Sequence, residues 1–364
     1  MKTKFILLCA ATAVLAACAK TEVTPEILNQ DAEITFLTAP VTKAASENEK
    51  TFANTNVFQT AAFYDTAKNG FVYTSGTAET YIEKSTVKNF SGLWKVADPN
   101  DGTKAKSYYW PKDGGKLSFF SWSLNTESLA FTQGTPTVDI NVNDGVKLTG
   151  YSSLKNDDFM VADPALDMTQ NTNPGKFYTE GVPTLFHHKT AMVEIKVKTK
   201  ENYEADSFGN FKQDFQLNEI KFANLLTDGN YTQNGDTWSN TSATESASYY
   251  VKATDGQDIT PDATAVDTES STEGSVCLYL PQSFTDDNTL NVKYTVTRIK
   301  SDGTPGSSKE NTASIKMSKI LGENVNFEMG KKYVITLIFG LDEILWDPAV
   351  QEWEVGATKE INVQ

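Results

Sequence analysis

The sequence predicts an all-β protein made of two antiparallel β-sandwich domains in series, and three observations lead to this fold class. Short runs of β-branched and aromatic residues recur along the chain, separated by Asp, Asn, Gly, Ser and Pro. Many runs alternate apolar and polar residues with a period of two, as strands with one buried face do. No long segment shows the 3.6-residue period of an amphipathic helix. The clearest predicted strands are 116–122, 137–142, 192–198, 275–280, 290–299 and 332–339.

The first 17 residues predict a secretory signal that ends in a lipidation motif. Lys2 and Lys4 precede a short apolar run, which is too short to span a bilayer as a helix. Leu15-Ala16-Ala17-Cys18 then places small residues directly before a cysteine. We expect the mature protein to begin at Cys18 and to hang from a membrane, outside the cytoplasm, by acyl chains such as palmitate. An ordinary signal peptide with a chance cysteine is the alternative.

Composition narrows the class of protein. The chain has 364 residues, which is long for a single core, and a formal net charge of −15. Such acidity argues against a nucleic-acid partner, because phosphates must be neutralised by Lys and Arg. Once Cys9 leaves with the signal and Cys18 carries lipid, Cys277 is the remaining cysteine, so no intrachain disulfide is expected. Its apolar surroundings predict a buried, inert thiol.

The residues that carry enzymatic chemistry are missing. His187 and His188 are the two histidines, and neighbours in a strand point to opposite faces, so we expect one packed and one exposed side chain. No nucleophile elbow, zinc-binding helix or phosphate-binding loop occurs. The acidic residues Asp157, Asp158, Asp163 and Asp167 could gather around calcium, but solvated turns are the better interpretation. We therefore expect no enzyme, no cofactor and no metal.

A short strand is expected near the beginning of the mature chain. Ile34 and Phe36 alternate with polar Thr35, and Pro40 ends the run because proline cannot donate to a sheet. The small, polar segment that follows contains Lys43 and Ala44, where a trypsin-like protease could cut a flexible loop and remove this first strand. The alternative is one more surface lysine.

The end of the chain has a comparable pattern. Trp353, Val355, Ala357, Ile361 and Val363 share one face of a predicted strand, with Lys359 as the single misfit, and no partner strand follows. The tail could be the last strand of its own domain. It could instead fill a groove in another molecule, gaining main-chain hydrogen bonds and side-chain pockets at alternate positions.

These features divide the chain into five expected segments. They are the signal peptide 1–17, the lipid-proximal tether with the removable first strand 18–43, the N-terminal β-sandwich 44–200, the C-terminal β-sandwich 201–346 and the donor-type strand 347–364. The polar residues 234–273 are expected to form long loops.

Several short motifs follow one another along the mature chain. Besides the lipidation motif and Ile34-Thr35-Phe36 with Thr42-Lys43-Ala44, they include an aromatic hairpin around Tyr108-Tyr109-Trp110-Pro111, then Asp158-Phe159-Met160-Val161-Ala162, Val182-Pro183 to His188, Leu278-Tyr279-Leu280-Pro281-Gln282, Gly330-Lys331-Lys332-Tyr333 and Val350-Gln351-Glu352-Trp353. In this order they resemble the motifs of the fimbrillin family, the type V pilins of Gram-negative bacteria.

The resemblance implies two tandem transthyretin-like sandwiches and a lipid-anchored precursor at the outer membrane. An extracellular protease removes the first strand of such a precursor, and the C-terminal strand of a neighbouring subunit replaces it. One departure is Lys43, since the family site usually carries arginine. Either lysine is accepted, or this subunit stays uncut and anchors the pilus.

The resulting hypothesis is a fimbrial structural subunit that polymerises by strand exchange and supports adhesion. Its expected partners are other fimbrial subunits, the outer membrane before processing, and host or bacterial surface ligands. A surface lipoprotein that binds glycans through exposed aromatics, such as Trp94, Trp110 and Trp122, is the main alternative. An uncut monomeric lipoprotein with a self-inserted C-terminal strand is a third possibility.

Overall fold

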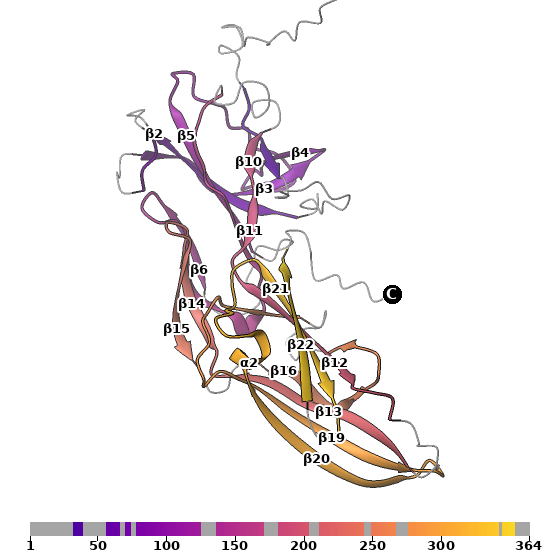
Figure 1. Ribbon diagram of the computed structural model, residues 1–364. Coiled ribbons are helices and arrows are strands. Elements are labelled where there is room, and N and C mark those ends of the chain that lie inside the picture. The colour runs from indigo at the N-terminus through magenta and orange to yellow at the C-terminus, as the bar shows by residue number, and fades with distance from the viewer. Residues whose placement is uncertain are drawn as a thin grey trace, which may run out of the picture.

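The computed structural model describes residues 32–38, 56–65, 70–73, 78–124, 136–170, 181–203, 211–243, 249–266, 276–341 and 344–353. Most of these residues are in strands, which form four sheets arranged as two sandwiches, one above the other in Figure 1. The helices in this part of the chain are the short α2 (Met317–Leu321) and the 3-10 turn η2 (Ser153–Lys155). The predicted all-β class is confirmed, and the six strands expected most clearly correspond to β5, β6, β12, β18, β19 and β21.

Sheet I has nine strands in the order β10-β1-β4-β3-β2-β5-β8-β11, with β9 paired to β5. The strands are β1 (Phe36–Thr38), β2 (Phe58–Asp65), β3 (Ala78–Phe90), β4 (Leu93–Val96), β5 (Lys116–Leu124), β8 (Phe159–Ala162), β9 (Ala165–Met168), β10 (Val182–Thr184) and β11 (Phe186–His188). β10 and β11 follow one another in sequence yet stand at opposite ends of this order. One short segment therefore joins both margins of sheet I, which must curl to allow it.

The strand β5 shows how sheet I is buried on both sides. Leu117 and Phe119 point into an apolar cluster enclosed by the curl, together with Phe36, Phe58 and Trp94. The intervening positions belong to a second cluster, which packs sheet I against sheet II; they are Phe120, Trp122 and Leu124. Because both faces are covered, β5 is buried at every position after Lys116, and the positions that are not apolar carry the small residue serine.

Sheet II completes the first sandwich with β6 (Thr137–Asn141), β7 (Gly145–Ser152), β14 (Leu226–Thr232) and β15 (Thr237–Ala243), in the order β15-β14-β7-β6. Sheet III contains β12 (Ala191–Thr199), β17 (Thr264–Ala265), β18 (Val276–Tyr279), β21 (Lys331–Phe339) and β22 (Ile344–Glu352). Sheet IV contains β13 (Phe211–Ala223), β16 (Tyr249–Ile259), β19 (Thr289–Lys300) and β20 (Pro305–Lys316).

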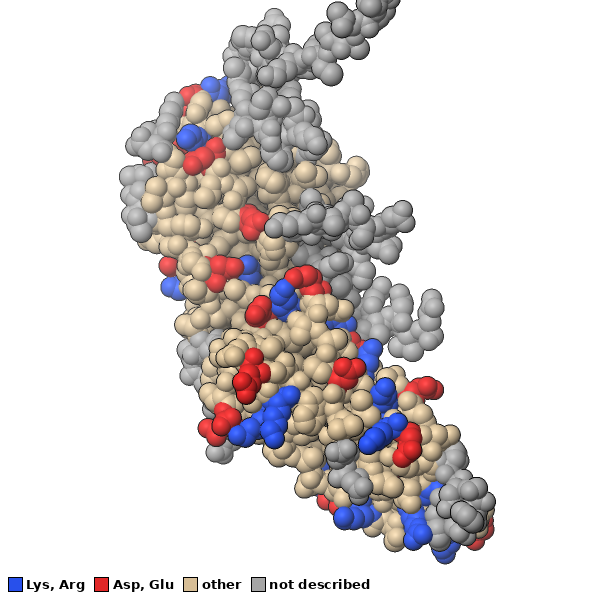
Figure 2. Space-filling model, in the orientation of Figure 1, with Lys and Arg blue, Asp and Glu red and all other residues tan. Residues whose placement is uncertain are grey.

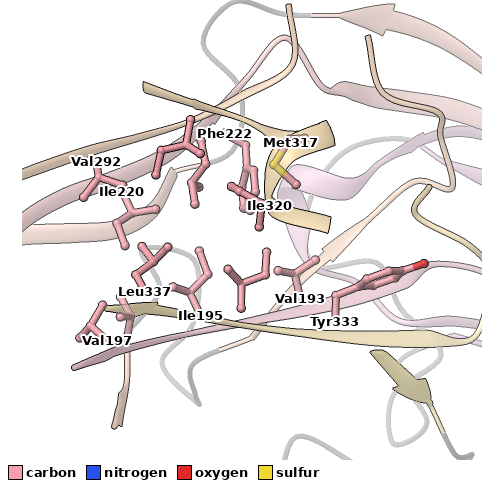
Figure 3. Close-up of a cluster of buried hydrophobic side chains, with 14 of the residues drawn as sticks. Val193, Ile195, Val197, Ile220, Phe222, Val292, Met317, Ile320, Tyr333 and Leu337 are labelled. Carbon is pink, nitrogen blue, oxygen red and sulfur yellow. The ribbon is translucent and has the colours of Figure 1, made fainter. Parts of the chain in front are cut away.

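Sheets III and IV enclose the core of the second sandwich. Val193, Ile195 and Val197 project from β12, while Ile220 and Phe222 project from β13 on the facing sheet (Figure 3). The strict alternation along β12 places every second side chain in this core, as the period of a strand requires. α2 closes one end of the core with Met317 and Ile320, so its short apolar face has a direct packing role.

The two sandwiches exchange strands across the boundary expected at residue 200. β12 precedes that residue but pairs in parallel with β21 of the second sandwich, from Met192↔Lys332 to Thr199↔Phe339. β14 and β15 follow it but extend sheet II of the first sandwich, where Tyr231 stands opposite Leu148. The C-terminal boundary expected at 347 also falls inside a strand, because β22 begins at Ile344.

The prediction of long loops in residues 234–273 is wrong for much of that stretch, because it contains the strands β15, β16 and β17. Threonine is β-branched and favours strands, and a partner strand satisfies the backbone whatever the polarity of the side chains. In β15, Trp238 also packs on Tyr151 and Tyr231, with ring centroids 5.3 and 5.6 Å apart. Only one side of such a strand needs apolar residues.

Charged side chains are sparse on the first sandwich and denser on the second, on the face shown in Figure 2. Acidic and basic groups are interspersed there, so the net negative charge is not gathered into one patch on this face. Among the residues described, no helix has the length and apolar character needed to cross a bilayer.

Candidate assembly site: the first strand and the C-terminal strand

The first strand is an interior strand of sheet I. β1 pairs in parallel with β10, at Phe36↔Val182, and antiparallel with β4, at Phe36↔Trp94. The residues before it add backbone hydrogen bonds: Ile34 N–H donates to Tyr108 O at 2.7 Å, and Val182 N–H donates to Thr35 O at 2.7 Å. Strand neighbours on both sides mean that loss of this segment would open a slot between β10 and β4.

Ile34 and Phe36 are buried in the enclosed cluster of sheet I, with exposed fractions of 3% and 2%. The Phe36 ring meets Phe58 and Phe119 edge to face, with centroids 5.7 and 5.9 Å apart. Burial of each such side chain contributes about 1.5–3 kcal/mol, before the cost of ordering the strand. The predicted alternation is confirmed for these two residues.

Gly181 provides the clearance that the first strand needs. Its φ is +106°, a backbone conformation that favours glycine. A Cβ at this position would lie 2.8 Å from Thr35 O and 2.8 Å from the carbonyl carbon of Phe36. Both neighbours are backbone atoms that cannot rotate away, so a side chain at Gly181 is incompatible with the seated first strand.

Glu33 ties the polar side of the first strand to the rim of the sheet. Lys95 Nζ lies 2.5 Å from Glu33 Oε2, and Ser107 Oγ donates to Glu33 Oε1 at 2.6 Å. Burial alone would raise the pKa of Glu33, but these hydrogen bonds and the charge of Lys95 outweigh it and lower the pKa below 4.5. The ionised carboxylate is therefore part of what retains the strand.

The C-terminal strand β22 lies at the margin of sheet III. It pairs antiparallel with β21 from Phe339↔Ile344 to Lys331↔Glu352, and no further strand adds to it within the described chain. Ile344 and Trp346 pack toward the core, whereas Leu345 and Val350 are 37% and 50% exposed. Residues 347–352 of the expected donor strand are thus paired within their own domain.

Trp353 follows β22 directly and is buried on its own chain. It belongs to a small cluster with Met192, Val276 and Leu278, and it is 7% exposed. Its indole ring also stacks on the imidazole of His188, with centroids 3.5 Å apart and planes 9° from parallel. This contact joins the end of β22 to the last residue of β11.

The remaining predicted residues of this site lie outside the described residues. They are the lipidation residue Cys18, the processing residues Lys43 and Ala44, and the donor residues Val355, Ala357, Ile361 and Val363. Ile34, Phe36 and Trp353 are those that the structure places. Gly181 and the His188–Trp353 stack were missed from the sequence, because no local pattern shows which distant backbone a glycine approaches or which ring a tryptophan covers.

The two histidines behave as expected. His188 is buried and accepts or donates a hydrogen bond with Asp158 at 2.9 Å, while the His187 side chain is 39% exposed and lies 3.1 Å from Asp163. Cys277 is buried in the second core. Across the described ranges, no three His, Cys, Asp or Glu side chains come together as a metal site would require.

All six tryptophans fall within the described residues, and none is exposed. Trp94, Trp110, Trp122 and Trp353 are buried, with exposed fractions of 7% or less. Trp238 and Trp346 are half-buried, and their indole N–H groups donate to the backbone carbonyls of Lys189 and Lys319. No pair of tryptophans forms an exposed platform.

Comparison with known proteins identifies the protein family to which this fold belongs. A family model described as fimbrillin-like matches residues 55–353. The chain therefore belongs to the fimbrillin-like family, and it is a fimbrial structural protein rather than an enzyme. A search of curated proteins finds no match.

One of two similar solved structures supports the fold. A fimbrial protein from Bacteroides vulgatus is 17% identical, with a TM-score of 0.62 over 88% of this chain and 99% of that one. A protein assigned to cell adhesion from Bacteroides uniformis is 13% identical, with a TM-score of 0.46 over 89% of this chain and 99% of that one. The first likeness supports the same arrangement of sheets.

Replacing Gly181 with alanine should unseat the first strand. The new methyl group would clash with the backbone at Thr35 and Phe36, and we expect a loss of about 2–4 kcal/mol in the free energy of unfolding. Chemical denaturation measures this loss, and proteolysis should release residues before 56 earlier. Gly114→Ala is the matched control, since Gly114 also has a positive φ, +75°, but nothing lies within 4 Å of its added Cβ. Equal losses in the two variants would contradict this role.

The contribution of Glu33 to stability should depend on pH. Because its folded pKa is lowered below 4.5, the stabilisation is present above pH 4.5 and is lost as the pH falls through the lowered pKa. Glu33→Gln should therefore lower the melting temperature at pH 7, and the difference from wild type should shrink as the pH falls through the lowered pKa. A difference between wild type and variant that persists unchanged at pH 3 would show that the ionised carboxylate is not the cause.

Proposed function

We propose that this chain is a structural subunit of a type V fimbria and that it polymerises outside the outer membrane by donor-strand exchange. One observation carries the proposal: the first strand is fully inserted between β10 and β4, yet it is a short segment that belongs to no hairpin within the described chain. A segment held in this way can leave without unfolding the strands around it. A strand from another subunit can then take its place.

Processing after Lys43 would remove the first strand. Cleavage between Lys43 and Ala44 separates Ile34 and Phe36 from the rest of the sandwich, so their apolar pockets beside Phe58, Trp94 and Phe119 become available. Water in such pockets is unfavourable, and an incoming strand with apolar residues at alternate positions relieves that cost. Other fimbrial subunits are the partners of this proposal.

The donor would be the end of the chain after Trp353. Trp353 is buried on its own chain, so we assign the donor role to Val355, Ala357, Ile361 and Val363, which share one face of the predicted strand. Each Val or Ile that fills a pocket adds about 1.5–3 kcal/mol, so Val355, Ile361 and Val363 together offset much of the association cost of roughly 4–15 kcal/mol, and the main-chain hydrogen bonds of the added strand contribute further. A subunit with both a slot and a donor suits the stalk of a fimbria.

Membrane attachment would precede assembly. Lipidated Cys18 would hold the precursor at the outer membrane, on the same segment that carries the first strand. Cleavage after Lys43 would then free the subunit from its anchor and open its slot in one step. Adhesion to host or bacterial surface ligands would be a property of the assembled fimbria.

The glycan-binding alternative finds no support in the tryptophan side chains. It required exposed tryptophans, ideally a coplanar pair, whereas all six are buried or half-buried. Trp94, Trp110 and Trp122 pack in the two clusters of the first sandwich.

Placing a carboxylate on the donor face should prevent polymerisation. Ile361→Asp would bury an unpaired charge in the slot of the neighbour, costing several kcal/mol, and about 1.4 kcal/mol weakens association tenfold. After cleavage at Lys43, we expect the ladder of polymers seen on gels to disappear while the melting temperature of the monomer stays unchanged. Asn362→Asp is the matched control, because Asn362 falls on the opposite face of the predicted strand. The protein with this change should polymerise normally. If Ile361→Asp instead lowers the melting temperature and polymers persist, the tail belongs to its own domain.

Lipidation is tested by Cys18→Ala. The variant lacks the thiol that takes the acyl chains, so we expect it to leave the membrane fraction and to keep its signal peptide. Fractionation and mass measurement of the N-terminus give the readout. Retention of the variant in membranes at the level of wild type would disprove an anchor at this residue.

A further inference from the structure

Trp353 is held by contacts that differ from those of the strand before it. β22 is fixed by a ladder of backbone hydrogen bonds to β21. Beyond it, Trp353 N–H donates to Gly330 O at 2.7 Å, and Gly330 N–H donates in turn to Thr190 O at 3.0 Å. The side chain stacks on His188 and contacts Met192, Val276 and Leu278. Trp353 therefore marks where the C-terminal segment stops being part of sheet III.

The seat of Trp353, formed by His188, Met192, Val276 and Leu278, lacks one interaction that the two half-buried tryptophans of this chain make. Its Nε1 is buried but has no hydrogen-bond partner among the described residues. By contrast, the Nε1 atoms of Trp346 and Trp238 donate to backbone carbonyls at 3.0 and 2.6 Å. A buried donor without an acceptor weakens the docked state. Trp353 is thus well packed by the ring stack, but its indole N–H has no acceptor among the described residues. This combination favours reversible docking of the Trp353 side chain.

The seat also lies on the segment that borders the slot. His188 ends β11, and β10, which pairs with the first strand, is separated from β11 only by Leu185. The imidazole is fixed by Asp158 of the loop before β8, and β11 itself pairs with β8. The seven-residue segment from Val182 to His188, made of β10, Leu185 and β11, therefore borders the slot at one end and Trp353 at the other.

We propose that Trp353, stacked on His188, is a releasable latch that holds the base of the C-terminal segment on its own domain and limits how fast a subunit can donate. This inference rests on the proposed donor-strand exchange and specifies how donation is controlled. It also changes the role of Trp353. Instead of filling the slot of the neighbouring subunit, Trp353 holds the donor segment on its own subunit.

Separate donors and acceptors test the latch. The donor is the intact chain from residue 19, whose first strand still fills its slot. The acceptor is the chain cleaved at Lys43 and ending at Trp353, which has no tail to donate. Heterodimer formation is followed over time by native mass spectrometry.

The rate of heterodimer formation distinguishes the two roles of Trp353. A latch predicts that a Trp353→Ala donor reacts about tenfold faster than the wild-type donor, which corresponds to about 1.4 kcal/mol of lost docking free energy. A residue that fills the neighbour's slot predicts a slower reaction. An equal or slower rate would overturn the latch while leaving donor-strand exchange intact. If no donor forms a heterodimer, donor-strand exchange itself fails, and the latch with it.

A second variant reaches the same contact from the other side. His188→Gln removes the ring but keeps a side chain able to hydrogen-bond with Asp158, so it should also accelerate donation. This variant decides the outcome if Trp353→Ala does not fold. Val292→Ala is the control for general loss of stability, because Val292 is buried in sheet IV away from the seat. It should lower the melting temperature without changing the rate of donation, and acceleration by Val292→Ala equal to that of the seat variants would overturn the latch.

Discussion

The seven-residue segment from Val182 to His188 is the constraint on which the first sandwich depends. Its two short strands pair with β1 at one margin of sheet I and with β8 at the other, so the sheet curls around its own apolar cluster. The curl gives β1 a neighbour on each side, even though the first strand is only three residues long. A flat sheet would leave so short a strand at an edge, where one ladder could not hold it.

The same segment leads directly into β12, and the order of strands makes the two sandwiches interdependent. β12 passes from the first sandwich into the middle of sheet III, while β14 and β15 return from the second half of the chain to extend sheet II. Lys189, at the crossing point, pairs with Asp236 at 2.8 Å, and Trp238 donates to its carbonyl. Sheets II and III therefore each need strands from both halves of the sequence, whereas sheets I and IV are each built from one half.

Alternation along single strands could be read from the sequence, and it predicted the fold class, the burial of Ile34 and Phe36, and the strands of the second core. Pairing between distant strands could not be read in this way. Thr and Ser in β15 predicted a loop, because the sequence does not show that β14 pairs with this segment and satisfies its backbone hydrogen bonds. The clearance at Gly181 and the stack between His188 and Trp353 join residues more than 100 positions apart in sequence. Such contacts depend on topology, which local patterns do not encode.

The two ends of sheet III have different mechanical roles. β12 enters it at Met192 beside Lys332, and β22 leaves it at Glu352 beside Lys331, so chain entry and chain exit lie at one end of the sheet (Figure 1). In a fibre built through the slot and the tail, tension would pass from β10 to β11 and across to the end of β22. The long hairpin of β19 and β20 at the opposite end would carry almost none of it. Such a fibre would carry its load through the first sandwiches and the adjoining end of sheet III, while the far part of each second sandwich would project as an unloaded branch.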